Sequence, residues 1–141
     1  MQTISSLQSS AQLVQLLKTA RNIAVVGLSP KENRPSNMVA RYLLAAGYRV
    51  FPVNPGQDEI LGLPCYPSLA AVPGQIDIVD IFRNPADVLP IVEEALGLSP
   101  LPQAIWMQQG IVNEEAAALA RAKGLMVVMD RCIKVDHANL L

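Results

Sequence analysis

The fold of this chain is decided by the stretch NIAVVGLSPKENRPSNM, which spans residues 22–38. It opens with a continuous apolar run from Ile23 to Val26, and the run ends at Gly27. A short apolar run of this kind predicts a strand that is buried on both faces of a sheet. A polar loop follows, and a predicted helix begins at Ser36 or Asn37 and ends before Gly47.

The same alternation of strand and helix continues along the chain. Strands are predicted at residues 22–28, 48–53, 77–82, 104–107 and 125–129, and a short extended piece at 60–63. Helices are predicted at 9–20, 36–46, 68–72, 85–96 and 113–123. Strands that alternate with helices favour a parallel sheet. The sequence therefore predicts one α/β domain over residues 1–141. It is a Rossmann-like, doubly wound parallel sheet of about five strands with helices on both faces, and residues 1–21 supply an N-terminal helix packed on it.

Composition narrows the class of protein further. The 141 residues are 51% hydrophobic and 16% charged, with a formal net charge of -1, so no basic surface for nucleic acid is expected. No apolar run approaches the roughly 20 residues that span a membrane. The first ten residues lack the basic and apolar regions of a secretory signal, and Cys65 and Cys132 are far apart. These features predict a soluble cytoplasmic protein.

The residues that follow the strands are the candidate binding residues, because ligands of open α/β sheets lie beyond the carboxyl ends of the strands. Gly27 allows close approach of a ligand to the backbone, and the helix that follows directs its positive end at the loop. Donor groups are supplied by Ser29, Lys31, Arg34 and Ser36. Together they predict a site for a phosphate or pyrophosphate.

This loop differs from the common nucleotide-binding motifs. Ser29 stands where the dinucleotide motif GxGxxG needs a glycine, and no GK[ST] follows as in a P-loop. The strand at 48–53 is followed by Asn54, whereas NAD-binding folds place a carboxylate there. A neutral Asn54 tolerates a phosphate on the ribose, which favours NADP or another nucleotide with a phosphorylated ribose.

The strand at 77–82 is followed by a second cationic group. Arg83 is placed to reach a phosphate, and a guanidinium suits several phosphate oxygens at once. Phe82 either packs on an adenine ring or belongs to the core.

Several motifs, in order, resemble those of the small stand-alone CoA-binding proteins, which are similar to the CoA-binding domain of the succinyl-CoA synthetase alpha subunit. They are AVVGLS, RPS, GYRVFPVNP, ILG, YPSL, VDIFRNP, WMQQGIVNEEAA and VVMDRCIKVDH. The resemblance covers residues 23 to about 137. It implies a Rossmann-like fold that holds coenzyme A, with the phosphates on the loop from Gly27 through Leu28 to Ser29.

The resemblance also implies which other residues contact the ligand. They are Arg34, Ser36, Val53, Asn54, Pro55, Phe82, Arg83 and Pro85. The 3′-phosphate of CoA agrees with the missing carboxylate at Asn54. Gln57 stands where the synthetase has a lysine, so Lys31, Arg34 or Arg83 has to meet the phosphate charge. The synthetase's second domain and phosphorylated histidine are absent, so its ligase activity is not implied.

Catalytic groups are sparse in the sequence. Cys132 and His137, with Asp136 beside them, form a conceivable catalytic thiol dyad. The expected alternative is that Cys132 is a structural thiol and His137 a surface histidine. The charges of residues 130–137 are expected to form salt bridges that close the last strand. Gln108 follows the strand at 104–107, where it can hydrogen-bond the amides of a pantetheine arm but cannot act as acid or base. Trp106 and Met107 are expected in the core.

We therefore expect a protein that holds CoA or an acyl-CoA without catalysis of its own. An NADP-dependent reductase, an acyl-CoA thioesterase or transferase that uses Cys132, and an interaction module with a vestigial site are the alternatives. The expected partners are the small-molecule ligand, a second copy in a homodimer, or an enzyme that uses acyl-CoA.

Overall fold

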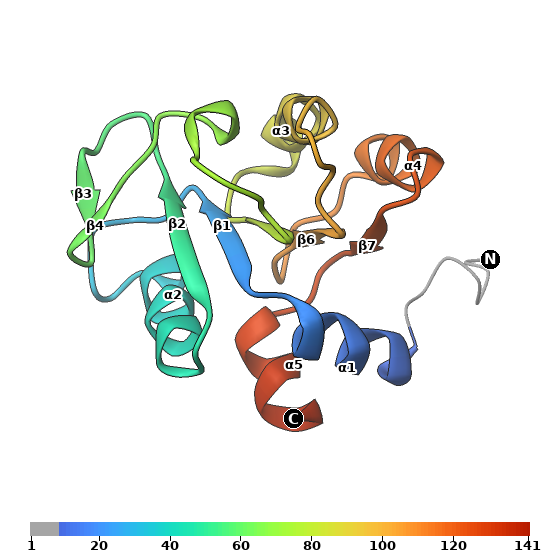
Figure 1. The fold of residues 1–141 in the computed structure, drawn as a ribbon, viewed down its shortest axis with the longest axis horizontal. Helices are drawn as coiled ribbons and strands as arrows, with labels where there is room; N and C mark the ends of the chain where they lie inside the picture. The colour runs from blue at the N-terminus through green and yellow to red at the C-terminus, as the bar shows by residue number, and fades with distance from the viewer. Residues whose placement is uncertain (1–8) are drawn as a thin grey trace.

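A computed structural model describes residues 9–141 as a parallel sheet of five strands with helices on both faces (Figure 1). The predicted Rossmann-like α/β fold class is confirmed. Residues 1–8, which carry most of the segment expected to lack a secretory signal, lie outside the described residues. The strands of the sheet are β1 (Asn22–Val26), β2 (Arg49–Val53), β5 (Ile78–Ile81), β6 (Ala104–Met107) and β7 (Met126–Val128).

The helices form a layer on each face of the sheet (Figure 1). One face is covered by α3 (Val88–Ala95), α4 (Glu114–Ala122) and the short 3-10 helix η2 (Leu69–Ala71). The other face is covered by α1 (Ser10–Thr19), α2 (Pro35–Ala45) and α5 (Ile133–Leu140). Because both faces are covered, every residue of β5 and β6 is buried, which explains why their sequences are apolar apart from Asp80.

The strand order is β2-β1-β5-β6-β7, and this order creates the crevice of the molecule. β1 lies between β2 and β5, with Val25 level with Pro52 on one side and Asp80 on the other. The chain leaves β1 for α2 on one face of the sheet and leaves β5 for α3 on the other face. The loops after β1 and β5 thus diverge at the switch point, where doubly wound folds bind ligands.

The helix ends follow the capping residues of the sequence. Ser9 and Gln12 form a reciprocal capping box at the start of α1. Asn113 caps α4, since its side chain accepts a hydrogen bond from the N–H of Ala116 at 2.9 Å. α2 begins one residue earlier than expected, with Pro35 in its first turn.

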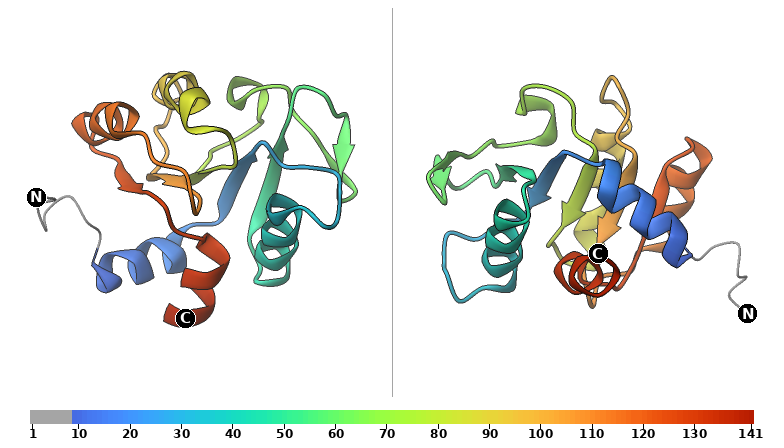
Figure 2. Two further views of the ribbon diagram at one scale, coloured as in Figure 1. Left: turned by 180° about the vertical axis from the view of Figure 1, so that it is seen from behind. Right: turned by 60° about the horizontal axis from the view of Figure 1, so that its bottom comes forward.

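Two parts of the chain differ from the expectation. Residues 59–64 form an antiparallel hairpin of β3 (Glu59–Ile60) and β4 (Leu63–Pro64), where only a short extended piece was predicted. Residues 133–140 form α5, which contacts α1 and α2, rather than a segment that only closes the last strand (Figure 2). None of the helices within residues 9–141 is long and apolar enough to cross a membrane.

Candidate functional site

A cavity of about 450 Å³ lies at the carboxyl end of the sheet, at the switch point between β1 and β5. Its walls come from the loops after β1, β5 and β6. The lining residues are Gly27, Ser29, Arg34, Pro35, Ser36, Phe82, Arg83, Asn84, Pro85, Gly110 and Ile111. The structure therefore brings the predicted residues Gly27, Ser29, Arg34, Ser36, Phe82, Arg83 and Pro85 together around one space.

Gly27 lies where the loops after β1 and β5 come closest. Its φ is +86°, in the left-handed region, and its N–H donates to the Val53 carbonyl at 2.9 Å. A Cβ at this position would overlap the Phe82 carbonyl oxygen and lie 2.8 Å from Cδ of Arg83. Glycine is therefore needed here both for the backbone turn and for the approach of the two loops.

The loop after β1 is held in shape by its own serines. The Ser29 N–H donates to Oγ of Ser36 at 2.9 Å, and the Ser29 carbonyl accepts from Nδ2 of Asn37 at 2.9 Å. The hydroxyl of Ser29 also accepts from the Lys31 N–H at 3.1 Å. Ser36 thus closes the loop instead of capping α2, and its buried hydroxyl keeps a proton to donate into the cavity that it lines.

The charge of the cavity wall is positive. Arg34 and Arg83 both line it, and the described lining residues include no aspartate or glutamate. The first turn of α2 adds the positive end of its dipole through Pro35 and Ser36. The guanidinium of Arg83 lies 3.4 Å from the Asp87 carboxylate, and both side chains are more than two-fifths exposed. This arrangement suits the phosphates of a ligand.

Residues 21–138 match the family described as the CoA binding domain. The chain belongs to this family. The resemblance carried by the sequence motifs is thereby confirmed.

Individual relatives agree with the family. The chain is 45% identical over 130 residues to the uncharacterized protein YneT of Bacillus subtilis, covering 92% of this chain and 95% of YneT. It is 30% identical over 127 residues to the ADP-forming acetate–CoA ligase I of Archaeoglobus fulgidus, covering 84% of this chain but only 18% of the ligase. A solved hypothetical protein from Pyrococcus horikoshii OT3 is 36% identical, with a TM-score of 0.92 over 99% of this chain and 96% of that one.

The other predicted binding residues are not among those that line the cavity. Leu28 and Val53 are buried in the core, and Lys31 and Pro55 are exposed. Asn54 lies after β2, where Nδ2 donates to the Leu28 carbonyl at 3.0 Å and Oδ1 accepts from the Gly56 N–H at 2.9 Å. Its observed contacts fix the loops after β1 and β2. A direct role in ligand binding for these residues stays a prediction.

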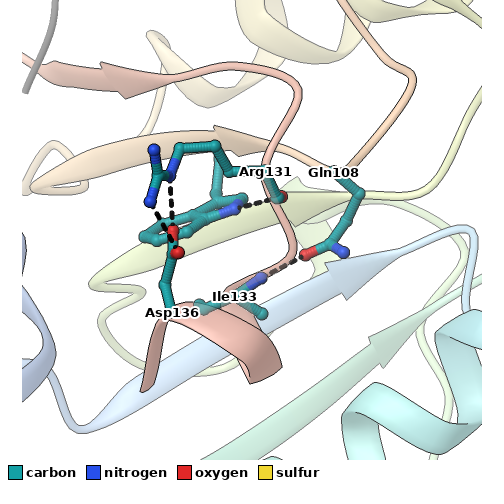
Figure 3. Close-up of polar contacts among 5 residues, drawn as sticks. Gln108, Arg131, Ile133 and Asp136 are labelled. Carbon is teal, nitrogen blue, oxygen red and sulfur yellow. Dashed lines mark hydrogen bonds and ion pairs between the residues drawn. The ribbon is translucent and has the colours of Figure 1, made fainter. Parts of the chain in front are cut away.

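Gln108 is buried at the end of β6, and its Oε1 accepts from the Ile133 N–H at 3.2 Å (Figure 3). In the structure this amide therefore holds the start of α5, and its predicted contact with pantetheine is not tested. Four further residues line the cavity and were not predicted to bind the ligand, namely Pro35, Asn84, Gly110 and Ile111. The first three lie in the segments that follow β1, β5 and β6, which was the available signal, whereas nothing in the sequence marks Ile111.

The conceivable thiol dyad is not assembled as a pair. Cys132 immediately precedes α5, and His137 lies further along that helix, where its Nδ1 is 2.7 Å from the Tyr42 hydroxyl. The His137 ring also packs edge-on against Tyr42 and Tyr48. The partner of His137 is therefore a tyrosine of α2, and neither Cys132 nor His137 lines the cavity.

One buried acid lies beneath the site. Asp80, in the central strand β5, is fully buried between Val25 of β1 and Trp106 of β6. Within residues 9–141 neither carboxyl oxygen has a hydrogen-bond partner. Burial raises the pKa of the Asp80 carboxyl well above its ordinary value, so the neutral form is favoured. The side chain of Asp80 is not part of the cavity wall.

Proposed function

We propose that this protein binds coenzyme A or an acyl-CoA in the cavity between the loops after β1 and β5. The observation that carries the proposal is the pair of arginines, Arg34 and Arg83, which both line one cavity at the switch point of the sheet. Membership in the CoA binding domain family supports coenzyme A as the ligand.

The placement of the phosphates follows from the donors. The pyrophosphate lies on the loop from Gly27 to Ser29, near the first turn of α2, where the hydroxyl of Ser36 and the guanidinium of Arg34 can donate to it. Arg83 meets further phosphate oxygens from the opposite wall, after exchanging its exposed contact with Asp87.

The proposed role is binding without catalysis. The described residues that line the cavity include no cysteine, histidine or carboxylate. Acyl transfer needs a nucleophile activated by a base in hydrogen-bond reach, and the hydroxyl of Ser36 is engaged by the Ser29 N–H instead. The protein therefore serves to carry or sense the ligand, or to present it to an enzyme.

Isothermal titration of CoA into the wild type and into Arg83→Glu tests the proposal. We expect wild type to bind and the variant to lose nearly all affinity, because a carboxylate would then face the phosphates. Lys123→Glu makes the same change of charge at the end of α4, outside the cavity, and should bind as wild type does. Equal affinity of Arg83→Glu and wild type would refute the assigned site.

A thermal-shift comparison separates the ligand classes. CoA at one hundred times its Kd should add about 2.7 kcal/mol to the free energy of unfolding. That gain corresponds to a rise in Tm of about 11 °C for a chain of this size. A larger shift with NADPH than with CoA would favour a reductase. Thiol release from acetyl-CoA that disappears in Cys132→Ala would favour a thioesterase.

A further inference from the structure

Gly110 and Ile111, in the loop after β6, form part of the cavity wall. Within this loop the Ile111 N–H donates to the Gln108 carbonyl at 2.9 Å, and the Ile111 side chain packs against the hydrophobic core. The loop is also held by the segment that follows β7.

Asp130, in the loop after β7, holds both wall residues. Its Oδ1 accepts from the Gly110 N–H at 2.6 Å, and its own N–H donates to the Ile111 carbonyl at 3.2 Å. To make both contacts, Asp130 adopts a φ of +57°, in the left-handed region that few residues other than glycine enter. A left-handed non-glycine residue persists only where the surrounding structure fixes it, and such residues gather at functional sites.

The segment after Asp130 is anchored firmly to the sheet. The Arg131 carbonyl accepts from Nε1 of Trp106 at 2.8 Å, and the Ile133 N–H donates to Gln108 (Figure 3). The Arg131 guanidinium makes two bonds of 2.7 Å to the carboxylate of Asp136 in α5. Asp130 therefore transmits the position of this anchored segment to the cavity wall.

We propose that Asp130 is a positioning residue for the ligand site, which fixes the loop of Gly110 and Ile111 as part of the cavity wall. The inference rests on the proposed function and adds a residue that does not itself line the cavity. Its carboxylate orients the wall through the Gly110 N–H. Without that contact the wall samples other positions, and ligand affinity falls.

The test compares three variants by CoA titration and by hydrogen exchange of the Gly110 amide. Asp130→Gly keeps the left-handed backbone but removes the acceptor, so CoA affinity should fall by about threefold to tenfold and Gly110 exchange should accelerate. Asp130→Asn keeps an oxygen acceptor and tolerates the same φ, so it should restore both properties. Leu61→Gly is the matched control, since Leu61 is the other described non-glycine residue with positive φ and lies in the β3–β4 turn.

A merely structural role would lower Tm equally in Asp130→Gly and Leu61→Gly without a change in CoA affinity. Wild-type affinity in Asp130→Gly, or failure of Asp130→Asn to restore Gly110 protection, would overturn the proposal. If wild type binds no CoA, the proposed function itself fails. If wild type binds CoA and Arg83→Glu does not, a negative result at Asp130 counts against the positioning role alone.

Discussion

Gly27→Ala is the substitution by which the structure can be tested most sharply. At this position an alanine must adopt a φ of +86°, which costs about 1–2 kcal/mol for a residue with a Cβ. The same Cβ overlaps the backbone oxygen of Phe82, and forcing extra atoms into a packed region costs about 1–3 kcal/mol more. We therefore expect a loss of about 2–5 kcal/mol in the free energy of unfolding.

Gly124→Ala provides the control for the backbone cost alone. Gly124 ends α4 with a φ of +89°, and a Cβ there meets no atom within 4 Å. Its substitution should cost only about 1–2 kcal/mol. The difference between the two variants measures the contact between the loops after β1 and β5.

Thermal unfolding followed by circular dichroism measures both effects. One kcal/mol corresponds to about 4 °C for a chain of this size. The expected fall in Tm is thus about 8–20 °C for Gly27→Ala and about 4–8 °C for Gly124→Ala. Equal Tm values for Gly27→Ala and Gly124→Ala would refute the predicted cost of the loop contact. A CoA affinity of Gly27→Ala equal to that of wild type would refute it as well.

Three further predictions concern single side chains. Asp80→Asn should weaken the pH dependence of stability. Because the folded pKa of Asp80 lies above the ordinary 3.8, its contribution is fully present below about pH 4 and is lost as pH rises through the folded pKa, with a slope of about 1.4 kcal/mol per pH unit between the two pKa values. Urea denaturation between pH 4 and 8 measures this slope, and an unchanged slope in Asp80→Asn would contradict the prediction. Asp87→Asn frees Arg83 and should tighten CoA binding about two- to fivefold at low salt; titration at several salt concentrations checks this, and weaker binding would contradict it. Asn113→Ala removes the cap of α4 and should cost about 1 kcal/mol, read as a fall in Tm of about 4 °C; an unchanged Tm would show that the cap is dispensable.

The strands and helix ends could be predicted because their signals are local. β1 reads as a buried strand from Ile23 to Val26 alone, and Asn113 identifies the start of α4 by its own side-chain chemistry. The loops that form the site could be predicted as well, because the carboxyl ends of parallel strands meet at one edge of the sheet. Gly27, Arg34 and Arg83 were found in this way.

α5 was missed because its sequence shows little amphipathic pattern. Only Ile133 and Asp136 of its eight residues are buried, and charged residues interrupt the apolar positions. The helix is held instead by contacts distant in sequence, such as the bond between Gln108 and Ile133 and the contact of His137 with Tyr42.

The finer site geometry was also out of reach of the sequence. The sequence did not indicate that the side chains of Asn54 and Gln108 hold neighbouring loops, and their predicted contacts with the ligand stay predictions. The hydrogen bond from the Gly110 N–H to Asp130 joins residues 20 positions apart. The lack of a hydrogen-bond partner for Asp80 among residues 9–141 depends on three strands at once. Such features are set by packing and not by local pattern.

A crystal structure of the protein grown with CoA tests the central claim most directly. The account predicts the pyrophosphate on the backbone of Gly27 to Ser29, within hydrogen-bond distance of the Arg83 guanidinium, and the ligand running between the loops after β1 and β5. CoA bound at another face of the sheet, or phosphates that contact neither Gly27–Ser29 nor Arg83, would contradict it.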